Sequence, residues 1–342
     1  MDSLTLDDPS TEGKKTRIWV TILAFSLAAI LLYYSLRGLD WASFWQSLRI
    51  GQYHYLFATL PMAVLNYFLR ALRWRILVQD EKNLSLLNVF WANMIGYLGN
   101  LYLPARAGEL FRSAVLGKES GKGMSFVLAT ALTERVIDFV ALVVILSAAL
   151  LWQSNLPPFI LNISRGVGIG GLIGLLTIFI LPHQEKLLRD LICHIPLPKT
   201  WQALIENQST RFLTGMRSLQ NIHRITKFLA FTLIIWWIDG LSIVIGARIL
   251  SRTLSLSQAL ILLAALGLSS AIPSTPGYIG VYQFVAVSVL VPFGFSHADS
   301  LAYIIIIQIS GYILVTLLGL AGLWQARLAG NLPSLFQIHK RT

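Results

Sequence analysis

Long apolar runs separated by short polar segments are the dominant pattern along the chain. A run of about 20 apolar residues is long enough to cross a bilayer as a helix. Two apolar segments, 84–103 and 256–290, are interrupted or ended by glycine and proline and predict broken helices. The pattern predicts an all-α integral membrane protein, built as a polytopic helical bundle. Six uninterrupted runs are the candidate spans, at residues 18–36, 53–74, 124–152, 163–181, 228–250 and 301–326.

Each of the two broken segments carries the same short signal. Pro104 and Gly108 stand four positions apart in the first, and Pro276 and Gly280 repeat that spacing in the second. The two prolines are separated by about half of the 342-residue chain. We expect two broken-helix hairpins, one in each of two related halves, that meet near the middle of the membrane. Because proline and glycine are frequent in membrane helices, a chance match of the two signals is the alternative.

The positions of the basic residues distinguish between two possible topologies for these segments. Each segment either crosses the membrane fully or returns to its own side as a re-entrant hairpin. Basic loops remain on the cytoplasmic side. If only the first segment crossed, the basic loop 182–227 would lie outside, so the sequence favours six full spans and two re-entrant hairpins. Both termini are then cytoplasmic, together with the basic clusters at 14–17, 70–82, 112–122, 186–227 and 327–341.

The predicted topology divides the chain into two transmembrane halves. Each half makes three crossings, an odd number, so the halves have opposite orientations, as in the inverted repeats of many transporters. A cytoplasmic tail (1–17) precedes the first half (18–152). The second half (153–327) includes a cytoplasmic amphipathic segment (182–227), and a second cytoplasmic tail (328–342) follows it.

Composition agrees with a membrane protein and excludes several other classes. The chain is 55% hydrophobic and 13% charged, whereas soluble domains carry about 25% charged residues. The net charge of +11 comes from basic residues beside apolar spans, which disfavours nucleic acid as a partner. Cys193 is the only cysteine, so neither an intrachain disulfide nor a cysteine metal cluster can form. We expect no metal and no cofactor.

Charged residues of the first broken segment are the leading candidates for a binding site. A charge at bilayer depth costs about 2.5–3.5 kcal/mol on insertion scales and is usually paired or functional. Arg106 and Arg112 offer bidentate donors for a lipid phosphate. Glu109 would balance that charge or meet an ammonium headgroup. The structural alternatives are a Glu109–Arg112 pair that fixes the hairpin and an Arg112 that anchors the cytoplasmic interface.

Three further acidic residues lie inside predicted spans. Glu134 and Asp138 stand four apart and therefore share one helical face, with Arg135 close by. They would bind substrate, relay protons or form ion pairs with the first hairpin, or else form a structural pair inside the bundle. Asp239 has no nearby basic residue within its own span, so we expect it to face a cavity or to pair with an arginine of the other half.

The second broken segment is rich in residues that shape a turn. Pro276, Gly277 and Gly280 form a hairpin and expose N–H groups, which favour an anion together with a half-helix N-terminus. Tyr278 would line the same site, or lie at the membrane interface as aromatic residues often do. The candidate substrate-binding residues are therefore Arg106, Glu109, Arg112, Glu134, Arg135, Asp138, Asp239, Gly277, Tyr278 and Gly280.

Three motifs resemble the lysylphosphatidylglycerol synthase transmembrane region: PARAGELFR (104–112), LTERVIDFVAL (132–142) and STPGYIGVYQ (274–283). This region is the flippase-like domain of the multiple peptide resistance factor, and it also occurs in stand-alone UPF0104-type membrane proteins. The resemblance covers nearly all of the chain past its N-terminal tail. It implies a domain that moves lipids between leaflets. The lipid is aminoacylated phosphatidylglycerol in the best-known members, and hopanoids or polyprenyl-linked lipids are candidates in others.

By matching position, the resemblance implies that the family's functional residues correspond to the charged residues of the first motif, the Glu134–Arg135 pair and the glycines of the second hairpin. The family often shows P-G-G-x-G-x-x-E in that hairpin, where this chain has Tyr278 for the second glycine and Gln283 for the glutamate. Loss of that carboxylate weakens the expectation of a cationic aminoacyl headgroup. The chain ends soon after its last predicted span, so we expect no aminoacyl-transferase domain in it.

The sequence therefore favours a lipid flippase or scramblase in the bacterial cell membrane, with no enzymatic activity. Two alternatives stay open. One is an intramembrane enzyme acting on a lipid-linked substrate, with the carboxylates of the spans as acid–base groups. The other is a non-transporting scaffold. The expected partner is a membrane lipid, and either a homo-oligomer or a partner lipid-modifying enzyme is compatible with the sequence.

Overall fold

The computed structural model describes most of the chain as helix. The described residues are 9–78, 84–103, 106–151, 199–217, 221–270 and 275–328, with residue 330 and isolated positions between 169 and 184. Every regular element in these ranges is helical, which confirms the all-α class. The predicted span 163–181, the beginning of the amphipathic segment 182–227 and Pro104 lie outside the continuous described ranges.

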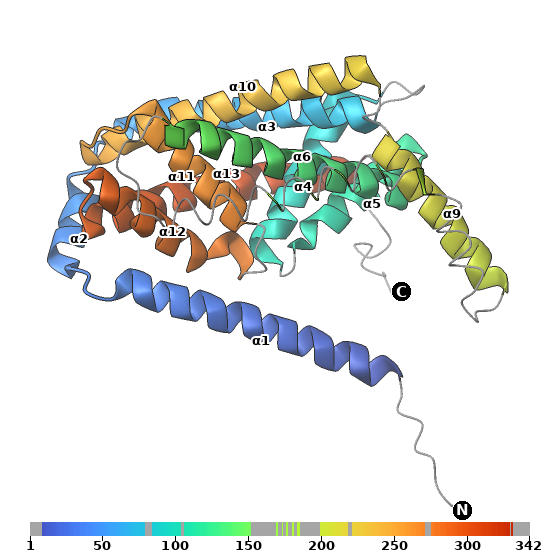
Figure 1. The fold of residues 1–342 in the computed structure, drawn as a ribbon, viewed down its shortest axis with the longest axis horizontal. Helices are drawn as coiled ribbons and strands as arrows, with labels where there is room; N and C mark the ends of the chain where they lie inside the picture. The colour runs from blue at the N-terminus through green and yellow to red at the C-terminus, as the bar shows by residue number, and fades with distance from the viewer. Residues whose placement is uncertain are drawn as a thin grey trace, which may run out of the picture.

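The longest helices follow the long axis of the molecule, and short 3₁₀ turns stand at several helix ends (Figure 1). The helices of the first half are α1 (Pro9–Leu36), α2 (Trp41–Arg49), α3 (Leu56–Val78), α4 (Leu86–Tyr102), α5 (Gly108–Ser120) and α6 (Met124–Leu151). Those of the second half are α9 (Lys199–Met216), α10 (Ile222–Ala247), α11 (Leu256–Ser269), α12 (Val281–Leu290) and α13 (His297–Leu328). The 3₁₀ turns are η1 (Tyr53–Tyr55), η5 (Arg248–Leu250), η6 (Pro276–Tyr278) and η7 (Val291–Phe293).

The described helices include those of an integral membrane protein. One membrane-length candidate, Pro276–Phe293, follows the turn of the second broken segment, and the α-helix within it, α12, has 10 residues. At 1.5 Å per residue, α12 is about 15 Å long. α6 has 28 residues, but its middle carries charged side chains. Four segments are long and apolar enough to cross a membrane: Tyr53–Val78, Ile222–Leu250, Pro276–Phe293 and His297–Leu328.

α4 and α5 form the first helical hairpin. Asn88 in the first turn of α4 donates to Glu119 in the last turn of α5, so the hairpin begins and ends at the same end of the molecule. The two limbs approach closely at glycines. A Cβ on Gly108 would overlap the carbonyl oxygen of Gly96, and a Cβ on Gly99 would lie 2.6 Å from the Gly108 Cα. The glycines in this part of the sequence therefore permit the crossing of the limbs.

α11, η6 and α12 form the second hairpin. Ser255 and Gln258 make a capping box that begins α11. In the turn, Gly277 (φ 69°) and Gly280 (φ 89°) have left-handed backbone, which glycine adopts without a Cβ clash. A Cβ on Gly280 would also overlap the carbonyl oxygen of Ala28 in α1. This glycine therefore lets α1 pack directly against the turn.

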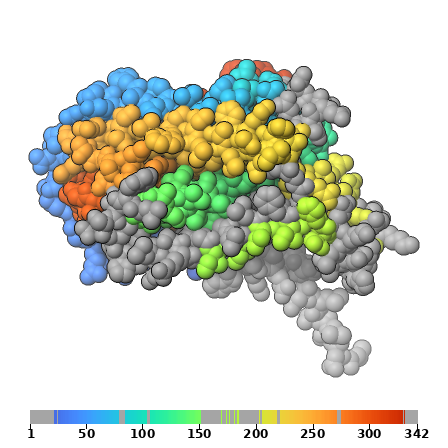
Figure 2. Space-filling view, turned by 45° about the horizontal axis from the view of Figure 1, so that its top comes forward, coloured from blue at the N-terminus to red at the C-terminus, as the bar shows by residue number. Residues whose placement is uncertain are grey.

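The hairpins pack on helices of the opposite half. α4 packs on α13, and α11 packs on α6, while α3 packs along α10. The shorter helix α2 packs against α13, and α9 packs against α6. Figure 2 looks onto the face where α10, coloured gold, and α6, coloured green, reach the surface. Each hairpin thus has one limb on its own half and one limb on a long helix of the other.

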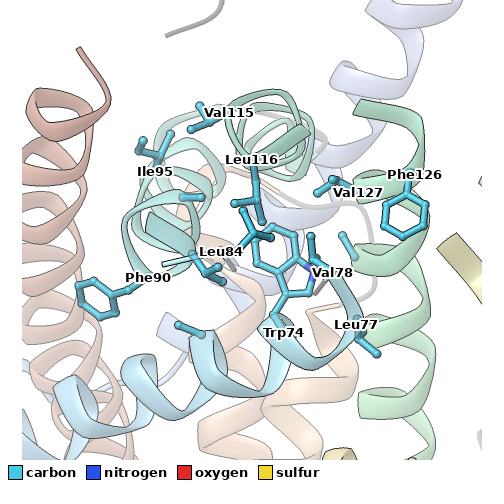
Figure 3. Close-up of a cluster of buried hydrophobic side chains, with 14 of the residues drawn as sticks. Trp74, Leu77, Val78, Leu84, Phe90, Ile95, Val115, Leu116, Phe126 and Val127 are labelled. Atoms are coloured by element: carbon cyan, nitrogen blue, oxygen red, sulfur yellow. The ribbon is translucent and has the colours of Figure 1, made fainter. Parts of the chain in front are cut away.

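An apolar core lies where α3, α4, α5 and α6 meet (Figure 3). Trp74 is fully buried there, and its Nε1 donates to Thr130 Oγ1 at 3.2 Å. Val78 and Leu116 lie next to the indole, and Leu77 and Val127 belong to the same cluster. Between helices in a membrane, close packing of this kind supplies most of the association energy, because lipid is as apolar as the side chains. The core holds the first hairpin against α3 and α6.

Candidate functional site

A buried charge cluster joins α3 to α6. Arg73 of α3 reaches both carboxylate oxygens of Asp138, with Nη1–Oδ1 and Nη2–Oδ2 distances of 2.6 and 2.8 Å. Arg73 Nη2 also donates to Glu134 Oε1 at 2.7 Å, and Arg73 Nη1 donates to Thr232 Oγ1 of α10 at 3.0 Å. The Arg73 side chain is fully buried and its guanidinium carbon lies 4.8 Å from the ring centroid of Phe228. Arg73 therefore clamps α6 and α10 onto α3 from inside the bundle.

Arg112 of α5 ties the first hairpin to the same cluster. Its Nη2 pairs with Glu109 Oε2 at 2.5 Å and with Glu134 Oε2 at 3.3 Å. Its Nη1 donates to Asn93 Oδ1 of α4 at 2.9 Å, and the guanidinium carbon lies 4.4 Å from the centroid of Trp74. The Arg112 side chain is 1% exposed. Arg112 is therefore a brace inside the hairpin and not a group that faces a cavity.

Arg135 completes the cluster. Its Nε and Nη2 both donate to Glu109 Oε1, at 3.0 and 2.8 Å, and its side chain is 26% exposed. Breaking such buried pairs is costly, because one partner then remains charged without compensation. The cluster is balanced, since it contains equal numbers of guanidinium and carboxylate groups: Arg73, Arg112, Arg135, Glu109, Glu134 and Asp138.

A cavity with two lobes opens beside this cluster. The larger lobe has a volume of about 660 Å³ and lies among α6, α10, α11 and the turns of both hairpins. The smaller lobe has a volume of about 370 Å³ and lies among α3, α4, α13 and the turn of the second hairpin. The lobes share one wall, formed by Tyr67, Arg70, Tyr97, Asn100, Asp239, Leu266, Tyr278 and Tyr282.

Arg106 stands at the tip of the first hairpin and lines the larger lobe. Its backbone is left-handed, with a φ of 55°, a conformation that costs an L-residue about 1–2 kcal/mol. Its Nε donates to the phenol oxygen of Tyr278 at 3.3 Å, and its Nη2 donates to Ser270 Oγ at 3.3 Å. No carboxylate of the described residues forms an ion pair with it. Arg106 therefore joins the tips of the two hairpins and brings to the cavity a positive charge that no described carboxylate pairs with.

Asp239 of α10 pairs with Arg70 of α3 in the wall that the two lobes share. Arg70 Nη2 donates to Asp239 Oδ2 at 2.8 Å, and the Nδ2 of Asn66 donates to the other oxygen. The side chains of Arg70 and Asp239 are 14% and 27% exposed. The Arg70 guanidinium also lies over the ring of Trp236, 4.9 Å from its centroid. Asp239 thus lines the cavity and also pairs with an arginine of the first half.

Neutral polar groups hold the turn of the second hairpin against α13. The Tyr312 hydroxyl and the Gln308 Nε2 of α13 both donate to the carbonyl oxygen of Gly277. Gln308 Oε1 accepts from Gln283 Nε2 at 2.6 Å, and Gln283 Oε1 accepts from the Gly280 N–H at 2.7 Å. Both ends of the Gln283 amide therefore form hydrogen bonds that hold the turn. An ionised glutamate at this position could accept from Gly280 but could not donate to Gln308.

The predicted site residues separate into two groups in the structure. Those in the cavity wall are Arg106, Arg135, Asp138, Asp239, Gly277 and Tyr278. Those outside the cavity wall are Glu109, Arg112, Glu134 and Gly280, which take part in the buried cluster or in the contact with α1.

Sequence reasoning missed two arginines of α3. Arg70 and Arg73 belong to the basic cluster 70–82, which suggests an anchor at the cytoplasmic end of a span. In the structure, Arg73 is fully buried in the cluster and Arg70 lines both lobes. Their spacing of three positions places both on one face of a helix, and this was the available signal. The polar residues Asn66, Gln308 and Tyr312 were missed as well.

The fold and the cavity define a class: a polytopic helical membrane protein in which two helical hairpins meet at a cavity that charged and aromatic side chains line. Within that class, the chain belongs to the family described as the lysylphosphatidylglycerol synthase transmembrane region, whose sequence model matches residues 21–319. The chain is also 26% identical over 224 residues to the UPF0104 membrane protein MJ1078 of Methanocaldococcus jannaschii. That alignment covers 64% of this chain and 90% of the relative. No solved structure matches the chain. The two matches confirm the family that the three motifs predicted.

Proposed function

We propose that the protein moves a polar or charged lipid between the leaflets of the cell membrane, as a flippase or scramblase. The observation that carries the proposal is the position of Arg106. Its guanidinium lies where the two hairpin tips meet and faces the cavity without a described carboxylate partner. A charge inside the hydrocarbon layer needs a counter-charge or a polar ligand. The headgroup of a passing lipid supplies one.

The cavity has the size and the lining of a path for a headgroup. Pockets of about 300–1,000 Å³ hold small molecules, and the two lobes, about 660 and 370 Å³, fall in this range. Arg106 and Arg135 line the larger lobe, and Arg70 and Asp239 lie in the shared wall. In this scheme the headgroup passes along these charged side chains while the acyl chains stay in the surrounding bilayer.

The proposed topology has six full spans, two re-entrant hairpins and cytoplasmic termini. Its sixth span, 163–181, lies outside the continuous described ranges. Lys118 Nζ donates to the Gly330 carbonyl oxygen at 2.7 Å, so α5 and α13 end at the same end of the molecule. Asn88 and Glu119 put the start of α4 there too. The basic residues at this end support its assignment to the cytoplasm.

Helix pairing supports an inverted repeat within the proposed topology. In this repeat, α3 corresponds to α10, α4 to α11, α5 to α12 and α6 to α13. Replacing each helix by its counterpart turns one observed packed pair of helices into another. The α4–α13 pair becomes α11–α6, and the α5–α6 pair becomes α12–α13. The α3–α4 pair becomes α10–α11, and the α2–α13 pair becomes α9–α6 if α2 corresponds to α9. Inverted repeats with broken helices at their interface are a common design of transporters.

The test is translocation of a headgroup-labelled lipid in proteoliposomes that contain the purified protein. The Arg106→Ala variant is expected to translocate more slowly while its expression and its elution from a sizing column stay unchanged. Arg49→Ala, at an exposed position in the last turn of α2, is the matched control and should translocate as fast as the parent protein. Equal rates for the parent and Arg106→Ala would remove Arg106 from the path.

The proposal includes no catalysed reaction. Mass spectrometry of the lipids before and after incubation with the purified protein tests this point, because an enzyme would create a new lipid species. The proposed partner is the transported lipid. A homo-oligomer or a lipid-modifying enzyme that supplies the lipid is compatible with the same topology.

A further inference from the structure

We propose that the transported headgroup is a monoanionic phosphodiester without an amine. This inference rests on the proposed function and narrows its substrate to one chemical class. Within the described residues, it follows from the balance of charges around the cavity, from the occupation of every carboxylate there, and from the donors of Arg106 that have no described partner.

The charges around the cavity leave one positive charge without compensation. Of the described residues, the buried cluster is balanced, and Arg70 and Asp239 balance each other in the shared wall. Arg106 is the remaining charged group in the lining of either lobe. A phosphodiester carries one negative charge at neutral pH. Its arrival would make the site electrically neutral, which favours it in a low-dielectric environment.

The carboxylates around the cavity are already occupied by donors. Both oxygens of Asp138 accept from Arg73. One oxygen of Asp239 accepts from Arg70, and the other accepts from Asn66. An ammonium headgroup would therefore have to displace a guanidinium from a carboxylate, which leaves that guanidinium uncompensated. The cavity is consequently unfavourable for a headgroup whose recognition depends on an amine.

The same holds for the two glutamates behind the cavity. Glu134 contacts Arg73 through Oε1 and Arg112 through Oε2. Glu109 contacts Arg135 through Oε1 and Arg112 through Oε2. Neither glutamate belongs to the lining of the two lobes. No described carboxylate of the cluster is left to receive an amine.

Arg106 keeps donors free for a phosphate. A guanidinium has five N–H groups, and the described partners of Arg106 are the hydroxyls of Tyr278 and Ser270, bound through Nε and Nη2. The two N–H groups of Nη1 have no described partner. Guanidinium groups bind phosphate oxygens through parallel N–H donors with good geometry. Because its present partners are neutral, binding a phosphate at Arg106 breaks no ion pair.

The neutral part of the lining suits a headgroup with hydroxyl groups. Tyr278 and Tyr282 stack with ring centroids 4.9 Å apart and 10° between ring planes, and both line both lobes. Gln308 and Tyr312 add an amide and a phenol to the smaller lobe. The donors of Gln308 and Tyr312 bind the Gly277 carbonyl oxygen, but the phenol oxygens of the lining keep lone pairs that accept from a hydroxyl, and none of these groups carries a charge. A phosphodiester headgroup of glycerol or sugar type matches this combination.

The experiment measures translocation of three tail-labelled lipids in vesicles of phosphatidylcholine. The probes are phosphatidylglycerol, an anionic phosphodiester with hydroxyls; phosphatidylethanolamine, which has an amine; and lysylphosphatidylglycerol, whose two amines make it cationic. All three lipids carry the phosphodiester, but the amine of two of them finds no described carboxylate that is not already paired. We therefore expect phosphatidylglycerol to cross about tenfold faster than either amine-bearing lipid, which corresponds to about 1.4 kcal/mol. Equal or faster transport of the amine-bearing lipids would overturn the inference and leave the proposed function intact. Transport of none of the three would overturn the proposed function itself.

Two variants of Arg106 locate the preference in the cavity. Arg106→Gln keeps an N–H donor for Tyr278 or Ser270 but removes the charge, so the preference for phosphatidylglycerol should disappear. Arg106→Lys keeps the charge and should retain the preference even if its rate falls. Arg49→Gln is the matched exposed control and should change nothing. A preference that persists in Arg106→Gln, with normal elution from a sizing column, would contradict the assignment.

A competition experiment with inorganic phosphate distinguishes a lipid phosphodiester from free phosphate as the ligand of Arg106. We expect an excess of inorganic phosphate to leave the rate of phosphatidylglycerol translocation unchanged, because the lipid brings its phosphodiester to the cavity from within the bilayer. Competition that depends on Arg106 would show instead that the site takes up free phosphate, and it would overturn the lipid assignment.

Discussion

Arg73 and Asp138 face each other on α3 and α6 and meet through two nearly parallel contacts, Nη1–Oδ1 at 2.6 Å and Nη2–Oδ2 at 2.8 Å. Parallel N–H donors make this the strongest geometry for a pair of guanidinium and carboxylate. Glu134 and Thr232 use further donors of the same guanidinium. The helices that carry the cavity are thus fixed by a pair that does not itself need the substrate.

Loss of the Arg73 guanidinium is the first prediction. Arg73→Met keeps the length of the side chain and leaves two carboxylates without their partner, so we expect a loss of about 3–5 kcal/mol in the free energy of unfolding. The measurement is the unfolding transition of the purified protein in detergent. Arg252→Met is the control, because the Arg252 side chain is 43% exposed although it pairs with Asp299 at 2.6 Å. An exposed pair contributes about 0–1 kcal/mol, and similar losses for the two variants would contradict the clamp.

The crossing of α4 and α5 gives the second prediction. Gly108→Ala places a methyl group on the carbonyl oxygen of Gly96, so the hairpin cannot close and the yield of folded protein should fall sharply. Gly311→Ala in α13 is the matched control, because no atom lies within 4 Å of its added Cβ. In a helix interior that exchange should be neutral or stabilise by up to about 1 kcal/mol. Yield and unfolding temperature in detergent distinguish the two, and equal behaviour would count against the close crossing.

The third prediction concerns coupling between the two halves. Arg70→Gln and Asp239→Asn, alone and together, form a double-mutant cycle across the α3–α10 pair. Contacting groups in a network show coupling of about 0.5–3 kcal/mol, and the partial exposure of both side chains argues for the lower part of this range. Unfolding free energies in detergent give the coupling. Arg70→Gln combined with Asp40→Asn is the control cycle, since Asp40 caps α2 and its described hydrogen bonds come from Ala42 and Ser43. Additive losses in the first cycle would contradict the pair.

The orientation in the membrane is the fourth prediction. In a Cys193→Ser background, a cysteine at Ser251 should react with a membrane-impermeant thiol reagent in intact cells. A cysteine at Lys118 should react only after the membrane is opened, because it lies at the basic end of the molecule. Both residues are exposed. Reaction of both positions from the same side would rule out the proposed topology.

Local sequence signals were sufficient for the elements and for part of the site. The spacing of proline and glycine predicted two broken helices, and the structure has a hairpin at each. The spacing of Glu134 and Asp138 predicted a shared helical face, and both contact Arg73. These features depend on helical periodicity and backbone conformation, which a few neighbouring residues determine.

The partners across helices could not be derived in the same way. The contact of Arg73 with Asp138 depends on the axial register between α3 and α6. Trp74 and its neighbours pack between these helices and help to set that register. Similarly, Glu109 lies outside the lining of the cavity because Arg112 and Arg135 hold it from two sides. Sequence indicates which charges enter the membrane, but the register between helices decides which of them remain for a ligand.

The packing of each hairpin on a long helix of the opposite half has a consequence for biosynthesis. α4 is made early, but the helix on which it rests, α13, is the last described one to leave the ribosome. A Cβ on Gly319 of α13 would lie 2.6 Å from the Leu98 Cβ of α4, so the two helices are in close contact there. During synthesis, α4 therefore stays without its packing partner until α13 has been made. The contact between α4 and α13 stabilises the first half only after that point. Two fragments cut between the halves and produced together in one cell would have to find each other to become stable.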